Sequence, residues 1–230
     1  MANQVTRRKF LTGAAALSVL AGCESRPAGA FLRLMGGWNE RAEGLLFSPN
    51  RLAPELPEAA ATDEEDFPVY FISTALPHAP ANWSLKVGGL VRTPTILTLD
   101  DLRAMPSTAM CVQHHCVEGW SAVAAWRGVR LSEIARRVGI DPRVRYVEFR
   151  SFDKGYSSGW DLASAMHPQT LLAYGMNGHP LTPEHGAPLR LYSAVKLGYK
   201  NVKYLTEVNF LPDKIGGYWE DQGYEWFGGV

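Results

Sequence analysis

The stretch Cys116-Val117-Glu118-Gly119-Trp120-Ser121 decides how this sequence is interpreted, because it holds one of only 3 cysteines in 230 residues. Cys111 and the pair His114-His115 lie just before it. Three interpretations are open: a Cys111–Cys116 disulfide, a zinc or copper site built from thiolates and imidazoles, or a single thiolate ligand to a metal that an organic cofactor holds. The spacing is not that of a zinc finger, and no second pair of ligands follows, which weakens the second interpretation.

A second informative block lies further along the chain, from His185 to Leu191 and again from Lys196 to Leu205. It combines cations with a glycine turn at Gly198, where the backbone can bend sharply and expose its amides. Arginine binds a phosphate through two parallel hydrogen bonds, and lysine acts as a point charge. The block therefore predicts a phosphate site, with a solvated basic face as the alternative. Its candidate contacts are the side chains of Arg190, Lys200 and Lys203 and the backbone amides of Asn201 and Val202.

The two blocks, in this order, resemble the sulfite-oxidase superfamily of molybdopterin-dependent oxidoreductases, and within it the branch of periplasmic protein-methionine-sulfoxide reductases. The resemblance covers about Phe67 to Tyr224 and includes a weaker match at Gly217–Tyr224. It implies a sulfite-oxidase type α+β fold and a molybdenum–molybdopterin cofactor. It also implies that Cys116 is the single protein ligand to molybdenum, while the other sulfurs come from the pterin dithiolene. Cys111 would then be an unpaired, buried small side chain.

The same resemblance implies a set of residues around the cofactor. We take Cys116 and His115 as the catalytic candidates, although either His114 or His115 could supply a proton. Neighbours on an extended segment point in opposite directions, so at most one of the two histidines faces the metal. For Tyr70 and Phe71, ordinary core packing is an equal alternative. The residues implied to bind the cofactor are Tyr70, Phe71, Ser151, His185, Arg190, Lys200, Asn201, Val202 and Lys203.

The reaction that the resemblance implies is two-electron oxygen-atom transfer. Sulfite oxidases follow the ligand cysteine with a Gly-Asn-Arg-Arg run that binds the anion, whereas this chain has Val117–Trp120, which holds an acid and no arginine. We therefore expect reduction of a neutral sulfoxide, or another S-oxide or N-oxide, either free or bound in a protein. A sulfite dehydrogenase of the same fold, or a non-catalytic periplasmic lipoprotein that binds a metal or ligand, are the alternatives.

The partners are limited by what the sequence lacks. It has no haem-attachment or iron–sulfur motif, so electrons must come from an external carrier, either a membrane haem b subunit or a cytochrome. Lys+Arg and Asp+Glu both number 23, so no basic excess points to nucleic acid.

The first residues read as an export signal. Arg7-Arg8 precede an apolar run that ends at Gly22, and this run is too short to span a bilayer. Residues 1–22 together resemble a twin-arginine leader. The alternative is an ordinary signal peptide. Leu20–Cys23 resembles a lipoprotein processing site, so we expect export to the periplasm and lipid attachment at Cys23, the only membrane contact we predict. A soluble periplasmic product is the alternative.

The remaining layout is one domain after a linker. Residues 23–66 show no sustained apolar periodicity and are expected to form a tether and an N-terminal arm, followed by a molybdopterin-binding domain over 67–230. Short strands mixed with a few short helices favour an α+β fold over a wound parallel sheet. We expect strands at 83–91, 144–149, 189–192 and 202–205, and helices at 99–105, 131–138 and 162–166.

Overall fold

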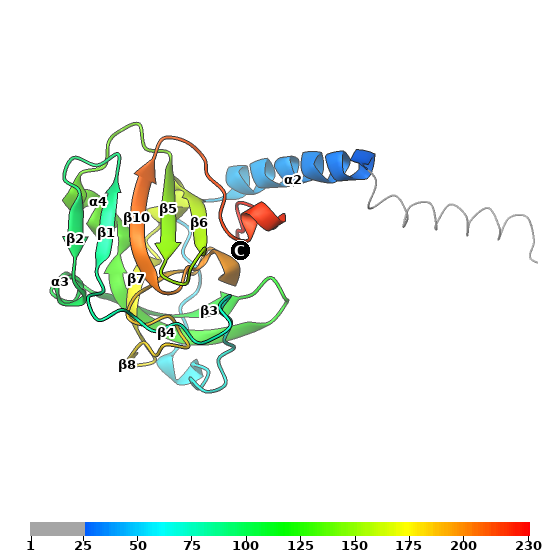
Figure 1. The fold of residues 1–230 in the computed structure, drawn as a ribbon. Coiled ribbons are helices and arrows are strands. Elements are labelled where there is room, and N and C mark those ends of the chain that lie inside the picture. The colour runs from blue at the N-terminus through cyan, green and yellow to red at the C-terminus, as the bar shows by residue number, and fades with distance from the viewer. Residues whose placement is uncertain (1–25) are drawn as a thin grey trace, which may run out of the picture. The chain divides into compact units, whose positions relative to one another are not determined.

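A computed structural model describes residues 26–230 of the chain. The predicted leader 1–22 and the predicted lipid site Cys23 lie outside the described residues. The chain divides into a first unit that ends at Leu46 and a compact unit over Phe47–Val230. The compact unit contains two β-sheets, which Figure 1 shows in ribbon form.

The first sheet has the strand order β2-β1-β10-β5-β6. Strands β1 and β10 run parallel, with Val87 opposite Val208, and the other neighbours are antiparallel. Leu85 and Val87 are buried and alternate with the exposed Lys86, as expected for a strand with one face on the core. The strands are β1 (Leu85–Gly89), β2 (Thr95–Leu97), β5 (Tyr146–Ser151), β6 (Ser157–Asp161) and β10 (Leu205–Leu211).

The second sheet is built around a long hairpin, β3–β4. β7 pairs with β4, and both β8 and β9 pair with β7. At the bulge after Arg127, Gly128 lets the sheet close, because a Cβ there would lie 2.1 Å from the Leu172 carbonyl oxygen. The strands are β3 (Thr108–His115), β4 (Ser121–Arg130), β7 (Thr170–Met176), β8 (His179–Pro180) and β9 (Arg190–Ser193).

A hydrophobic core joins the sheets to the short helices. α4 (Leu131–Val138) buries Leu131, Ile134, Ala135 and Val138 at helical spacing, and it ends at Gly139 in the left-handed conformation. α3 (Leu99–Arg103) starts with a capping box between Thr98 and Asp101. α5 spans Leu162–Ala165, and the short 3-10 turns are η2 (Glu58–Ala60), η3 (Gly198–Lys200) and η4 (Glu220–Gln222).

Most of the expected elements are confirmed, and the mixture of short strands and short helices confirms the α+β class. The strand expected at 202–205 is wrong, because β10 begins only at Leu205. Tyr204 has a φ of 58°, a left-handed conformation that no strand continues through. The chain therefore turns where an apolar-alternating pattern predicts an extended segment.

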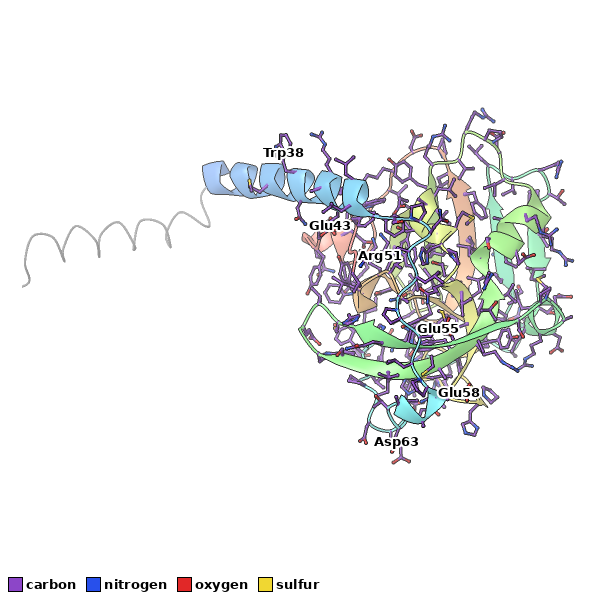
Figure 2. All side chains as sticks on the ribbon, turned by 180° about the vertical axis from the view of Figure 1, so that it is seen from behind. Trp38, Glu43, Arg51, Glu55, Glu58 and Asp63 are labelled. Atoms are coloured by element: carbon purple, nitrogen blue, oxygen red, sulfur yellow. The ribbon has the colours of Figure 1, made fainter. Side chains whose placement is uncertain are left out.

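The segment Phe47–Asp66, expected to be part of a tether and N-terminal arm, packs on the second sheet. Glu55 forms a β-bridge with Val112, and the Leu56 amide donates to the Cys111 carbonyl at 2.8 Å. The Thr62 amide likewise donates to the Val123 carbonyl at 2.9 Å. Figure 2 labels Arg51, Glu55, Glu58 and Asp63 along this path. The compact unit therefore starts at Phe47, earlier than the predicted boundary at residue 67.

The first unit is a single helix, α2 (Arg26–Leu46), of 21 residues. This corrects the expectation that the segment lacks apolar periodicity. Large apolar residues occur at positions 31, 32, 34, 35, 38, 45 and 46, and all of these except position 32 have the spacing of one helical face. Glycines at 36, 37 and 44 interrupt the pattern in the sequence, since glycine weakens a helix by about 1 kcal/mol relative to alanine.

Candidate active site

One cavity in the compact unit collects most of the predicted site residues. It encloses about 930 Å³ of space, part of which is open solvent. Its walls come from the segment 67–72, the end of β3 and the following turn, the end of β5, the start of β9, the loop before β10 and the segment after β10. The predicted residues that line it are Tyr70, Phe71, Cys116, Ser151, His185, Arg190, Asn201 and Lys203.

Cys116 occupies the turn of the β3–β4 hairpin. The turn is closed by a hydrogen bond from the Cys116 amide to the Trp120 carbonyl at 3.0 Å, and Gly119 adopts a φ of 92° within it. Glu118 accepts a hydrogen bond from Trp120 Nε1 at 2.9 Å and lies 3.7 Å from Cys116 Sγ. Burial raises the pKa of the Cys116 thiol. A metal ion is the usual means of holding such a thiol as a thiolate.

Cys111 is separate from this site. It is a free thiol, 5% exposed on β3, and its Sγ contacts the Pro57 carbonyl oxygen at 3.6 Å. Cys116 is also free. The disulfide interpretation is therefore not supported, and the prediction that Cys111 is a buried, unpaired side chain is confirmed.

Two cations face this cavity without forming an ion pair, although the charges of Asp153 and Glu184 act on Lys203 from a longer range. Arg190 is 5% exposed, donates from Nη1 to the His185 carbonyl at 3.0 Å, and has no partner at Nε. Lys203 donates to the Glu184 carbonyl at 2.9 Å. No ion pair to either residue occurs among residues 26–230. Burial lowers the pKa of Arg190 to about 10, and burial together with the Arg190 charge lowers that of Lys203 to about 7.

An anion is the group that these two cations lack. A buried guanidinium without a counter-charge is costly, and a phosphate would accept hydrogen bonds from it and satisfy Nε. The walls therefore fit a ligand that carries a phosphate, as molybdopterin does.

His114, and not His115, lines the cavity. His114 is 6% exposed and lies among three aromatic rings. The centroid of its ring is 5.7 Å from that of Phe67 and 5.8 Å from those of Trp120 and Tyr192. Its Nδ1 is buried without a partner. Burial lowers the pKa of His114 to about 3, so its ring is neutral at physiological pH. The structure thus assigns the cavity position to the histidine that we did not choose.

Three of the predicted residues in the cavity wall use their side chains to fix the wall itself. Asn201 accepts from the Ser193 amide at 2.7 Å and donates to two carbonyls of its own loop. Ser151 accepts from the Asp153 amide at 2.8 Å, and His185 Nε2 contacts the Glu64 carbonyl at 3.2 Å. The contacts of His185 and Asn201 hold the segments next to Arg190, on β9, and Lys203, in the loop before β10.

Lys200 and Val202 lie outside the cavity lining. The Lys200 ammonium is fully buried, pairs with the Glu220 carboxylate, and donates to the carbonyls of Gly159 at 2.9 Å and Trp226 at 2.7 Å. Val202 is a core residue. The predicted phosphate contact through the Lys200 side chain is therefore wrong, because that ammonium already has its full set of partners.

Sequence reasoning did not assign roles to the aromatic wall. Trp219 and Tyr224 come from the segment after β10, their rings lie 4.8 Å apart, and the Trp219 ring lies 5.9 Å from that of Tyr70. The density of tyrosine and tryptophan from Tyr218 to Trp226 is the signal that could have indicated this wall. The other cavity residues without a predicted role are Phe67, Pro68, Ile72, Val117, Asp153, Tyr156, Tyr199 and Tyr204.

The chemistry of these residues selects among the metal interpretations. Within residues 26–230, no group of three or more His, Cys, Asp or Glu side chains is placed to hold a metal ion. A zinc site would need such a group. A metal at Cys116 therefore requires ligands from outside the protein, and a dithiolene cofactor supplies them.

These features define an oxidoreductase with a molybdopterin-binding domain. The family model described as "Oxidoreductase molybdopterin binding domain" matches residues 73–219, and the chain belongs to that family. It is accordingly an oxidoreductase whose cofactor is molybdenum–molybdopterin.

Two named relatives are similar to this chain in sequence. The chain is 40% identical to a putative protein-methionine-sulfoxide reductase subunit, YedZ1, of Azospira oryzae, over 97% of this chain and 87% of the relative. It is 37% identical to the protein-methionine-sulfoxide reductase catalytic subunit MsrP of Xanthomonas axonopodis pv. citri, over 60% of this chain. That match covers 48% of the relative, so the chain spans about half of its length.

A solved structure shares the fold. The sulfane dehydrogenase SoxCD from Paracoccus pantotrophus matches with a TM-score of 0.61 and 22% sequence identity, over 74% of this chain and 47% of that chain. This likeness confirms the sulfite-oxidase type fold and carries no statement about substrate.

Proposed function

We propose that this protein is the catalytic subunit of a periplasmic molybdenum–molybdopterin reductase that acts on sulfoxides, with methionine sulfoxide as the leading substrate. The observation that carries the proposal is one cavity holding a single free thiol, at Cys116, together with the unpaired cations Arg190 and Lys203. The names of the two reductase relatives support the choice of substrate class.

The surroundings of Cys116 favour a neutral substrate. Glu118 is exposed and lies beside the thiol, where its carboxylate opposes the approach of an anion such as sulfite. The cations of the cavity come from the start of β9 and the loop before β10, and we assign them to the cofactor. Trp120 and the Trp219–Tyr224 wall offer apolar surface to the methyl and methylene groups of a methionine side chain.

The division of work follows from this arrangement. When bound, the cofactor supplies two-electron oxygen-atom transfer. Cys116 provides the protein ligand to the metal, and Arg190 and Lys203 hold the phosphate. The neutral His114 ring packs against Trp120 in the cavity wall. Reduction of the sulfoxide takes up two electrons and two protons and releases its oxygen as water. Glu118, exposed beside the thiol, would relay these protons from solvent.

The location and partners complete the proposal. We infer export in folded form by a twin-arginine leader over residues 1–22, followed by lipid attachment at Cys23. Among residues 26–230, no helix is long and apolar enough to cross a membrane. Electrons would come from an external carrier, either a membrane haem b subunit or a cytochrome, since the chain contains no motif for a second redox centre.

The test exchanges each of the two described cysteines in turn. Protein exported from its native host is analysed for molybdenum and zinc and assayed for reduction of methionine sulfoxide and oxidation of sulfite. We expect about one molybdenum per chain and sulfoxide reduction. Cys116→Ser should abolish the activity, and Cys111→Ser, whose thiol lies away from the cavity, should retain both metal and activity.

Several results would contradict the proposal. Zinc in place of molybdenum would remove the cofactor assignment. Sulfite oxidation without sulfoxide reduction would favour the sulfite dehydrogenase alternative. Full activity in Cys116→Ser would show that the thiol is not the ligand.

A further inference from the structure

The helix α2 carries a row of large apolar side chains that no other described residue covers. Met35 is 50% exposed, Trp38 61%, Leu45 87% and Leu46 84%. Their spacing of three, seven and one residues places them on one side of a helix with 3.6 residues per turn. Contiguous exposed apolar surface of this kind marks a contact with a membrane or another protein.

The other side of α2 is polar or lacks side chains. It carries Glu40, Glu43 and Arg41 together with the glycines at 36, 37 and 44. Asn39 donates to Glu43 at 3.1 Å along the helix, and the Arg41 guanidinium lies 5.9 Å from the centre of the Trp38 ring. The helix is therefore amphipathic, with a tryptophan and an arginine adjoining at the boundary between its two faces.

The position of α2 in the chain indicates what covers its apolar face. The helix begins at Arg26, three residues after Cys23, and three extended residues reach at most about 11 Å. If Cys23 carries the lipid, the start of α2 lies at the bilayer surface. The helix sequence contains three arginines and two glutamates, a balance that favours anionic lipid headgroups.

We propose that α2 lies in the plane of the membrane surface, with Met35, Trp38, Leu45 and Leu46 in the boundary between headgroups and acyl chains. The inference rests on the proposed anchoring at Cys23 and extends it. α2 is not among the helices that could cross a bilayer, since the described chain contains none of that kind. An amphipathic helix with tryptophan and leucine on one face is the form that binds along the surface.

This placement changes the role of the segment. A flexible tether would let the catalytic unit move away from the bilayer, whereas a surface-bound helix about 31 Å long ends at the residue before Phe47. The catalytic unit is then attached directly at the membrane surface. That raises its effective concentration near a membrane-bound electron donor.

The experiment measures the depth of Trp38 in a bilayer. The mature protein, purified from host membranes, is reconstituted into vesicles of phosphatidylethanolamine and phosphatidylglycerol, with or without brominated acyl chains. Quenching of tryptophan fluorescence is measured for the unmodified protein and for Trp38→Phe. The difference between the two is the quenching of Trp38 alone. We expect brominated lipid to quench the Trp38 signal and to leave Trp38→Phe largely unaffected.

A matched pair of variants tests the face. Met35→Glu places a charge on the apolar side and should abolish most of the Trp38 quenching. Gly36→Glu places the same charge on the next residue, where the space is open, and should leave the quenching unchanged. Equal quenching in the unmodified protein and Trp38→Phe, or equal effects of the two glutamates, would overturn the proposal.

Mass spectrometry of the same sample separates this inference from the anchor. An acylated Cys23 without Trp38 quenching would refute the surface helix and leave the anchor standing. Trp38 quenching in protein without an acyl chain would support the helix and refute the anchor.

Discussion

At the scale of single residues, the cavity is defined by charges that lack partners. Arg190 and Lys203 repel each other in the cavity wall, and no acid forms an ion pair with either among the described residues. We assign the phosphate of the cofactor as the anion that joins them. We therefore expect Lys203 to lose its proton near neutral pH in the protein without its cofactor and to stay charged in the complete enzyme.

The stability of the cofactor-free protein should rise with pH. Lys203 has a folded-state pKa of about 7, below the ordinary value of 10.5, and Lys196 is lowered to about 8, mainly by burial. Between pH 7 and about 10 the unfolded chain therefore binds more protons than the folded chain, so the free energy of unfolding increases with pH. Above about pH 10 the buried tyrosines reverse the trend, because the pKa of Tyr204 is raised to about 12.

Urea unfolding at several pH values in this window measures the effect. Lys203→Met should flatten the rise in part, and protein loaded with the cofactor should show a smaller rise, since the phosphate keeps Lys203 charged. An unchanged slope in both samples would show that Lys203 does not meet the anion.

The two histidines give a second residue-scale prediction. His114→Ala should lower molybdenum content and activity, because the ring packs between Phe67, Trp120 and Tyr192 in the cavity wall. Its loss should cost about 2–4 kcal/mol of stability, as for other large-to-small changes in a core. His115→Ala is the matched control, expected within about 0.5 kcal/mol of the unmodified protein with its metal retained. The reverse order of effects would restore His115 as the candidate.

Sequence reasoning reached these residues unevenly. Cys116, Arg190 and Lys203 could be predicted because they lie in short motifs. Lys200 could not be separated from Lys203, since both are lysines of one loop, and only the fold shows that Lys200 pairs with Glu220. The choice between His114 and His115 depends on which face of β3 turns inward, and a strand pattern without its sheet leaves that open.

At the scale of elements, the segment after β10 is held to the body by two buried ammonium groups. Lys196 donates to the Phe227 carbonyl at 2.6 Å and lies 3.4 Å from the centre of its ring, while Lys200 contacts Glu220 and Trp226. This segment supplies Trp219 and Tyr224 to the cavity. The two lysines therefore fix one wall of the active site.

Breaking the buried pair should release that wall. Lys200→Met leaves the Glu220 carboxylate buried without a counter-charge, with only the hydrogen bond from Ser158 Oγ, and this should cost about 3–5 kcal/mol. Lys86→Met is the control, because the Lys86–Glu207 pair is exposed on the first sheet and should contribute no more than about 1 kcal/mol. Denaturant unfolding, with limited proteolysis of the C-terminal segment, measures both. Equal losses in the two variants would refute the role of Lys200.

Two elements were predicted incorrectly from the sequence, each because of a local feature that interrupts the apolar pattern or the extended backbone. The helix α2 is interrupted in the sequence by glycines, and the turn before β10 depends on the left-handed conformation of Tyr204. Strong local signals, such as the four buried apolar positions and terminal Gly139 of α4, were sufficient to predict that helix with its observed bounds.

At the scale of the whole molecule, the compact unit should fold without the first helix. A chain starting at Phe47 should bind molybdenum and unfold cooperatively when made in the host cytoplasm. A chain starting at Phe67, the boundary expected from sequence, loses the Glu55–Val112 bridge and the Leu56 and Thr62 hydrogen bonds to the second sheet. It should be unstable or insoluble, which expression yield and thermal unfolding would report. Equal behaviour of the two truncations would show that residues 47–66 contribute nothing.

The parallel pairing of β1 with β10 has a consequence for synthesis. β10 is the central strand of the first sheet, yet it is translated about 120 residues after the strand it pairs with. At roughly 5–20 residues per second, the ribosome leaves β1 and β5 without their common neighbour for many seconds. The sheet can close only after the residues through Leu211 have emerged from the ribosome. With export in folded form, as proposed above, that delay gives the host an interval in which to load the cofactor before export begins.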